Sequence, residues 1–282
     1  IWSFGPLVVR YMDNPHLIPW QYIFGRGLTI FILLNLYLYF EEGKNFYKNY
    51  FKIGVSGLIG GSGLGIAMIS FMFSITNTSA AITLLCLAAM PFFTALLAFL
   101  FLKESISINV WISIFIATVG IIIMAVGNNE TNSFVGFIFG MTSSIGFSAF
   151  SVSLRWRKET PKFTTVAVAG LFCFVFATIM ILVNEQTFFS SSYNGALFSL
   201  HGTLVCLGLI LYSIGSKAIP AAELTLLSLT EVIGGIFWVW LPLFGINEVP
   251  DTNTIIGGFF LFISLFYYSL VMRWNKRYIG LN

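Results

Sequence analysis

Two charged residues lie inside long apolar stretches of this sequence, where either could bind a substrate. Glu231 lies about ten residues into the stretch 221–243. A carboxylate at such a depth costs several kcal/mol unless it is protonated, paired or in contact with water. Glu231 is therefore expected either to contact a substrate amine or carry a coupling proton, or else to hold two helices together by a hydrogen bond.

Arg26 lies midway along the stretch 17–40, and its guanidinium keeps its charge in proteins. It needs an acid, carbonyl oxygens or water as partners, or it must extend to the membrane surface. Glu231 and Asp13 are both candidate acids, and the sequence does not choose between them. Arg26 either clamps the interior together or recognises a substrate carboxylate.

Small, polar and aromatic residues share a helical face with Glu231 if residues 221–243 form one helix. The residues at these spacings of three or four are Ser228, Gly235, Trp238 and Pro242. Such a stripe favours a cavity wall over a lipid-facing surface.

Two other stretches carry further candidates. Ser148 belongs to a stripe of small residues in 134–154, which either packs closely against a helix or lines a cavity. His201 and Tyr212 are eleven residues apart and so share a helical face. A single histidine within a membrane is either a structural hydrogen-bonding group or a gate or proton relay.

Membrane-spanning helices must position these residues. Of the 282 residues, 57% are hydrophobic and 9% are charged, whereas a soluble domain has roughly a quarter charged residues. The composition predicts an all-α integral membrane protein. A span needs about 20 residues, and we predict ten spans. They are a partial first helix within 1–9 and residues 17–40, 53–75, 79–102, 108–127, 134–154, 164–183, 196–216, 221–243 and 254–272.

The basic residues predict the orientation of the chain. Twelve of the fourteen lie in alternate connections and at the C-terminal end, while Arg10 and Arg26 are the other two. Because short cytoplasmic loops retain Lys and Arg, both termini are expected to be cytoplasmic.

Two of the predicted spans are imperfect copies of each other. Residues 78–104 read TSAAITLLCLAAMPFFTALLAFLFLKE, and residues 219–248 read IPAAELTLLSLTEVIGGIFWVWLPLFGINE. With five spans in each half, an odd number, the second half must enter the membrane upside down. We therefore predict a five-helix repeat at 1–127, an inverted repeat at 134–272 and a cytoplasmic tail at 273–282.

The copies differ most informatively near their centres. The first has Met90-Pro91 where the second has Glu231-Val232. The second copy thus has a charged residue where the first has a proline that kinks the helix. We expect substrate binding or proton coupling at this position. A shorter match of residues 2–10 with 147–155 pairs Ser3 with Ser148, which makes Ser3 a further candidate.

The residues of the first copy resemble the signature of the EamA branch of the drug/metabolite transporter superfamily. They are a pair of small residues, a proline near the centre of the span and a terminal acid: Ala80-Ala81, Pro91 and Glu104. Arg26 is similar to an arginine common in the second span of the family. In the second half the family often has Glu-Pro, and here the acid Glu231 is kept while the proline is lost.

This resemblance covers essentially the whole chain. It implies a carrier in the bacterial cytoplasmic (inner) membrane, with a central cavity between two five-helix halves. Family members move amino acids, nucleotide-like metabolites or other small organic molecules, many of them outward.

We therefore predict a secondary transporter that exports a small organic metabolite such as an amino acid by alternating access, with a site at the midplane between the repeats. A proton-coupled exporter of drugs or cations is the alternative. A channel is less favoured, because one buried acid and one buried base are few for a polar pore. The residues expected to serve binding or coupling are Glu231, Arg26, Ser228, Trp238, Ser3, Ser148, Tyr212 and His201.

The expected partners are a small-molecule substrate and the lipid bilayer, with proton coupling as an option and a monomer or homodimer as the assembly. Neither nucleic acid, cofactor nor metal is expected. Enzymatic activity is not expected, because neither of the two histidines, His16 and His201, has a partner motif.

Overall fold

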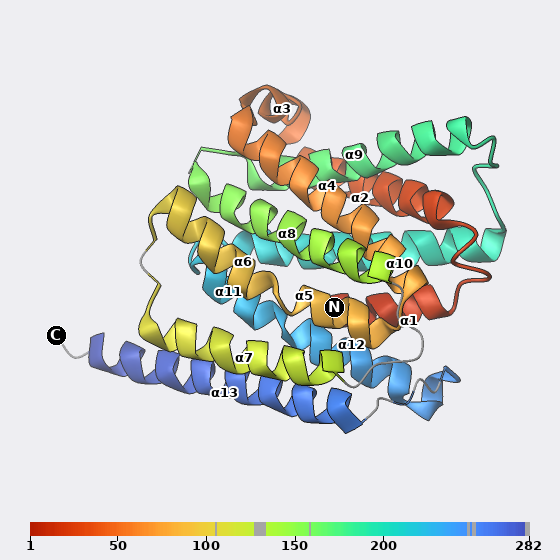
Figure 1. The fold of residues 1–282 in the computed structure, drawn as a ribbon. Helices are drawn as coiled ribbons and strands as arrows, with labels where there is room; N and C mark the ends of the chain where they lie inside the picture. Colours follow the sequence, from red (N-terminus) through yellow and green to blue (C-terminus); the bar gives the residue numbers. More distant parts are fainter. Residues whose placement is uncertain (105, 127–133, 158, 247–248, 250–251, 280–282) are drawn as a thin grey trace.

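The computed structural model describes residues 1–104, 106–126, 134–157, 159–246, 249 and 252–279 (Figure 1). These residues form an all-α bundle without strands. The elements are η1 (Trp2–Phe4), α1 (Gly5–Arg10), α2 (Pro19–Glu42), η2 (Gly43–Asn45), α3 (Lys48–Lys52), α4 (Gly54–Asn77), α5 (Ala80–Leu87), α6 (Met90–Leu97), η3 (Ala98–Leu102), α7 (Ile108–Val126), α8 (Phe134–Trp156), α9 (Lys162–Val183), α10 (Ser192–Gly215), α11 (Ala221–Ser228), α12 (Thr230–Trp240), η4 (Pro242–Phe244) and α13 (Thr252–Ile279).

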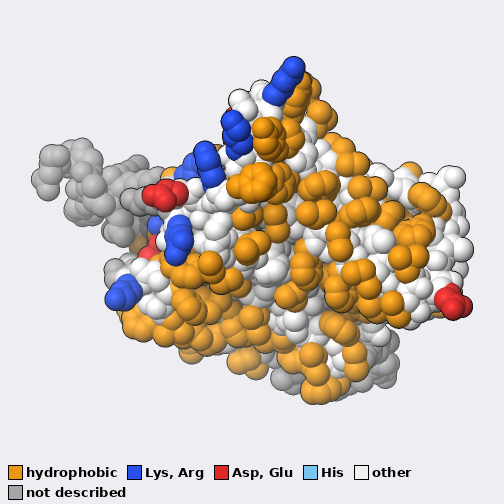
Figure 2. All heavy atoms as spheres, turned by 90° about the horizontal axis from the view of Figure 1, so that it is seen from above, with side chains coloured by type: hydrophobic (Ala, Val, Ile, Leu, Met, Phe, Trp, Pro, Cys, Tyr) orange, Lys and Arg blue, Asp and Glu red, His pale blue; other side chains and the backbone are white. Residues whose placement is uncertain are grey.

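The chain is a multi-pass membrane protein. Seven segments of the described residues are long and apolar enough to cross a bilayer, and 108–123 and 255–268 are shorter apolar helices. With the short α1, they occupy the ten predicted positions. Hydrophobic side chains cover much of the face seen in Figure 2, whereas Lys and Arg gather towards one end of it. Such a surface suits lipid along the sides and water at the ends.

The two halves pack in the same way. In the first half, α4 packs against α8 and α9; in the second, α10 packs against α1 and α2. Counted by spans, the third helix touches the sixth and seventh, and the eighth touches the first and second. The second helices of the two repeats, α2 and α9, pack against each other, and so do the fifth helices, α7 and α13. Figure 1 shows α7 and α13 side by side. The fold is thus two inverted five-helix repeats.

Two arginines form equivalent side-chain hydrogen bonds in the two repeats. Arg10 donates from Nη1 to the carbonyl of Ile75 at 3.3 Å, and Arg155 donates from Nη1 to the carbonyl of Ser216 at 3.2 Å. Each arginine thereby ties the first helix of its repeat to the end of the third. These bonds support the alignment of residues 2–10 with 147–155.

An ion pair joins the two halves at the end that carries most basic residues. Arg155 Nε donates to Glu104 Oε1 at 2.8 Å, so the acid that closes the first copy binds a helix of the second repeat. Glu248, which closes the second copy, lies outside the described residues.

Glycines allow a close helix approach at the crossing of α2 and α9. A Cβ built on Gly170 would lie 2.9 Å from the amide nitrogen of Phe31 and 3.0 Å from the carbonyl oxygen of Gly27. Because both neighbours are backbone atoms, neither can move aside by rotating a bond. The small residue sets the distance between the two helices.

We predict that Gly170→Ala destabilises the protein by about 1–3 kcal/mol, because the added methyl group overpacks a backbone contact. Gly195→Ala in α10 is the matched control, since a Cβ there meets nothing within 4 Å. The Gly195→Ala protein should be as stable as the natural sequence or more stable, because Ala has a higher helix propensity than Gly. Thermal unfolding in detergent micelles compares the two, and equal midpoints would contradict the prediction.

The fourth and ninth spans are each broken in the middle, which corrects the expectation of unbroken helices at 79–102 and 221–243. The first copy breaks between α5 and α6 at Ala88 and Ala89, and the second breaks between α11 and α12 at Leu229. In the alignment of the copies, Ala88 corresponds to Leu229. Both repeats therefore contain a discontinuous helix at the same depth.

A proline and two serines accommodate the first break. Pro91 has no N–H, and its ring competes for the space of a preceding carbonyl. Ser144 of α8 donates to the carbonyl of Cys86 at 2.6 Å, and Ser148 donates to the carbonyl of Met90 at 3.1 Å. These hydroxyls give the carbonyls next to the break a further partner, in a membrane interior that offers no water.

The second break has no proline and uses the hydroxyls of its own chain. Ser228 donates to the carbonyl of Thr225 at 2.6 Å, and Thr230 donates to the carbonyl of Leu227 at 3.0 Å. Such local side-chain bonds compete with helical hydrogen bonding. The same backbone shape is thus built by different residues in the two halves.

Candidate functional site

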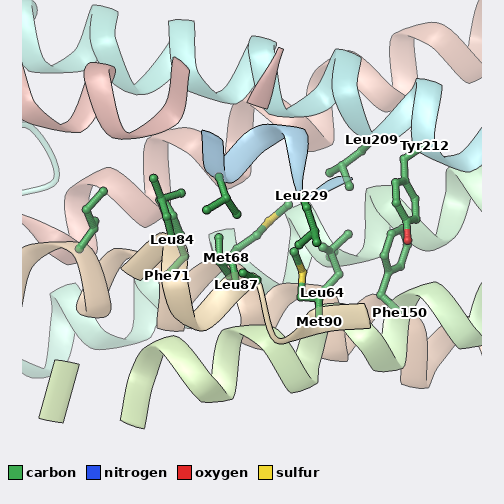
Figure 3. Close-up of a cluster of buried hydrophobic side chains, with 14 of the residues drawn as sticks. Leu64, Met68, Phe71, Leu84, Leu87, Met90, Phe150, Leu209, Tyr212 and Leu229 are labelled. Atoms are coloured by element: carbon green, nitrogen blue, oxygen red, sulfur yellow. The ribbon is translucent and has the colours of Figure 1, made fainter. Parts of the chain in front are cut away.

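A cavity of about 80 Å³ lies where the broken helices meet α1, α2, α4, α8 and α10. Its wall is mostly apolar, and Figure 3 shows part of that wall, with Leu64, Met68 and Phe71 near Leu87 and Met90. The lining residues are Trp2, Gly5, Arg26, Leu64, Ala67, Met68, Phe71, Leu87, Met90, Ser143, Phe147, His201, Val205, Leu209 and Glu231. Three of the predicted residues, Arg26, His201 and Glu231, thus share one cavity.

Arg26 is held rigidly at this cavity. Its side chain is only 3% exposed, its Nη1 donates to the hydroxyl of Tyr22 at 2.8 Å, and its Nη2 donates to the carbonyl of Met68 at 2.6 Å. The guanidinium carbon also lies 4.7 Å from the centre of the Tyr22 ring. Neither of the acids considered from the sequence, Glu231 or Asp13, forms an ion pair with Arg26 in the described part of the chain. The positive charge therefore remains available to a ligand.

His201 continues the hydrogen-bonded chain from Arg26. Its Nδ1 lies 2.5 Å from the hydroxyl of Tyr22, and both side chains are buried. Tyr22 was not among the candidates from the sequence. Its position four residues before Arg26 places it on the same helical face, and this spacing is the signal that could have identified it.

Glu231 lies directly after the break in the ninth span, in the first turn of α12. Its carboxylate makes no hydrogen bond or ion pair with any described residue. The break explains this position, because the chain turns at Leu229 and a helix begins again at Thr230. An acid at a helix N-terminus also meets the favourable end of the helix dipole.

Glu231 also borders a second cavity, of about 450 Å³. The lining residues of this cavity are Ile1, Trp2, Ser3, Gly208, Leu211, Tyr212, Leu224, Leu227, Ser228, Thr230 and Glu231. Predicted candidates Ser3, Tyr212 and Ser228 thus lie here rather than beside Arg26. Trp2 and Glu231 belong to both cavities, so the carboxylate stands between them.

Several predicted residues use their polar atoms in internal bonds. Tyr212 exchanges a hydrogen bond with Ser151 at 2.7 Å. Trp238 donates from Nε1 to the hydroxyl of Ser3 at 3.0 Å and stacks on Phe4 with ring centres 4.8 Å apart. Ser148 donates to the carbonyl of Met90, and neither Ser148 nor Trp238 lines the two cavities.

The expected stripe beside Glu231 is also interrupted. Because the ninth span breaks, Ser228 belongs to α11, while Gly235 and Trp238 belong to α12 and Pro242 begins η4. The residues do not form one continuous helical face, and the cavity wall comes instead from several helices.

Comparison with known proteins relates the first repeat to a known family. The model of the EamA-like transporter family matches residues 1–126, which contain all of the first repeat that the structure describes. Residues 1–126 of this chain are therefore similar to the EamA-like transporter family. EamA proteins form part of the drug/metabolite transporter superfamily, as the residues of the first copy suggested.

The chain also has relatives among curated proteins and solved structures. It is 29% identical over 148 residues to an uncharacterized transporter of Helicobacter pylori strain J99, and 28% identical over 148 residues to one of strain 26695. Each match covers 50% of this chain and 47% of the relative, so the aligned part is about half of each protein. A crystal structure with 16% identity superposes with a TM-score of 0.69 and covers 96% of this chain and 93% of that one, which shows a shared fold.

Proposed function

We propose that this protein exports a small zwitterionic metabolite, an amino acid with an apolar side chain, by alternating access between its two repeats. The observation that carries the proposal is the pair of opposite charges, Arg26 and Glu231, that line one apolar cavity without binding each other. In this proposal the guanidinium binds the substrate carboxylate, because Arg presents several donors to a planar acid. Glu231 receives the ammonium group.

The apolar wall supports the choice of side chain. Met68, Phe71, Met90 and Phe147 line the cavity, and two methionines allow the wall to adapt to side chains of different shape. The two discontinuous helices lie at the repeat interface, which is where transporters built from inverted repeats bind their substrates. Rocking of one repeat against the other would open the cavity to each side in turn.

Counterflow in proteoliposomes tests the proposal. The panel consists of apolar amino acids, their methyl esters, which keep only the positive charge, and their N-acetyl derivatives, which keep only the negative charge. We expect transport of the zwitterions and at least tenfold less of both analogues, because each loses one charge-assisted bond. If neither zwitterions nor analogues exchange, the proposed substrate class is wrong.

A second candidate function is proton-coupled export of organic cations. Glu231 favours it, because this free carboxylate lies between two cavities lined by Trp2. The same panel separates the candidates. Transport of the methyl esters and of cationic dyes, without transport of the N-acetyl derivatives or the free amino acids, would favour the cation exporter.

We further propose the bacterial cytoplasmic membrane as the location, with both termini cytoplasmic and residues 1–127 and 134–272 as the two repeats. The gathering of basic residues towards one end supports this orientation (Figure 2). Exposed Lys44 provides a test, because the three native cysteines are buried. Labelling of a Lys44→Cys variant by an impermeant reagent added outside intact cells would contradict the orientation.

A further inference from the structure

We propose that Tyr22 is a positioning residue that joins Arg26 and His201 into one carboxylate-binding subsite, in which His201 donates from Nε2. The inference rests on the proposed function for its ligand, but its central claim concerns the protein alone. Tyr22 touches both partners from within the protein and does not line the cavity itself. It is fully buried, at 0% exposure.

The direction of each hydrogen bond follows from the chemistry of the groups. A guanidinium has donors and no acceptor, so the Tyr22 oxygen accepts the bond from Arg26. The single hydrogen of this hydroxyl then has one acceptor in the described structure, the Nδ1 of His201 at 2.5 Å. If Nδ1 carried a proton instead, the Tyr22 hydrogen would be buried without a partner, which proteins avoid. Nδ1 is therefore unprotonated, and the ring proton is on Nε2.

Gly5 lies directly beside this second nitrogen, where a larger residue would not fit. A Cβ built on Gly5 would lie only 2.9 Å from Nε2 of His201, and both residues line the cavity. Nε2 makes no hydrogen bond with any described residue. The Nε2–H group is therefore a fixed donor that remains available to a ligand.

Arg26 completes the subsite. The guanidinium has five N–H donors, and the bonds to Tyr22 and Met68 use two of them. The bonds from α2 to α4 and, through Tyr22, to α10 fix the orientation of the remaining donors. Donors from Arg26 and His201 face one cavity in which Glu231 is the acid, and this arrangement separates the carboxylate end of a zwitterion from its ammonium end.

Nitrogen NMR of ring-labelled histidine tests the tautomer without a substrate. The protein in lipid nanodiscs at pH 7 contains only two histidines, and a His16→Gln variant, altered at an exposed residue outside the site, assigns the signals. We expect His201 as the Nε2–H tautomer in the natural sequence and a mixture of tautomers in Tyr22→Phe. A proton on Nδ1 in the natural sequence, or no change in Tyr22→Phe, would overturn the inference.

Counterflow of apolar amino acids against their methyl esters tests the effect on selectivity. In Tyr22→Phe the KM for the acid should rise roughly tenfold to a hundredfold, the size of one or two lost hydrogen bonds to a charged group. The maximal rate and the KM for the ester should change little. His201→Gln, which keeps an acceptor and a donor, should retain more affinity for the acid than His201→Leu. Equal losses for acid and ester would show a merely structural role. If the natural sequence transports neither compound, the proposed function fails, while the NMR result still decides whether Tyr22 positions His201.

Discussion

Glu231→Gln is expected to remove the pH dependence of transport while the protein still folds. Glutamine keeps the shape of the side chain and cannot exchange a proton. Because the carboxylate forms no bond with the described residues, its loss breaks no internal contact. Transport in proteoliposomes measured from pH 5 to 9 should fall at least tenfold at its optimum and lose its pH profile.

The matched control is Glu185→Gln, which changes an exposed acid in the connection between α9 and α10. It should retain both the rate and the pH profile. A Glu231→Gln protein with an unchanged pH profile would exclude proton coupling through this residue. If its profile is unchanged but its KM for the amine-bearing substrate rises, Glu231 binds the ammonium group alone.

Arg26→Gln is expected to weaken binding of the carboxylate by about a hundredfold, and Arg26→Lys should recover only a small part of it. Lysine keeps the charge but cannot present the planar fork of donors that binds Tyr22, Met68 and an acid together. Each lost bond to a charged group is worth about 1.5–3 kcal/mol. The KM for the zwitterion compared with its methyl ester measures the effect.

Stability must be followed in the same variants, because Arg26 also links α2 to α4. Arg157→Gln serves as the control for loss of a positive charge, since Arg157 contacts Trp156 outside the cavities. If Arg26→Gln melts at the temperature of the natural sequence but still selects the acid over the ester, the carboxylate is bound elsewhere.

The sequence predicted the class and the framework of the protein. Membrane spans follow from apolar length alone, because every backbone polar group in lipid must bond within a helix. The ends of α2, α4 and α8 therefore lie within about two residues of the predicted ones. The internal repeat predicted the inverted halves for the same reason, since an odd number of spans reverses the direction of the second half.

The helix breaks could be predicted in one half only. Pro91 is a visible helix breaker, but the second break, at Leu229, has no proline, and its hydroxyl bonds form only after the backbone has turned. The stripe beside Glu231 was correct for Gly235 and Trp238, which share α12 with it, and wrong for Ser228 and Pro242, because helical spacing holds only along an unbroken helix.

The candidate site was also predictable only in part from the sequence. The sequence alone determined which groups are costly in a membrane, because desolvation depends on the residue and its depth: Arg26, Glu231 and His201. Only the tertiary structure decided that Arg26 binds Tyr22 and Met68 rather than an acid, and that Glu231 is left free between two cavities. The physical reason is that Met68 and His201 approach this group from other helices, and hydrogen-bond geometry selects among partners that the sequence presents as equivalent.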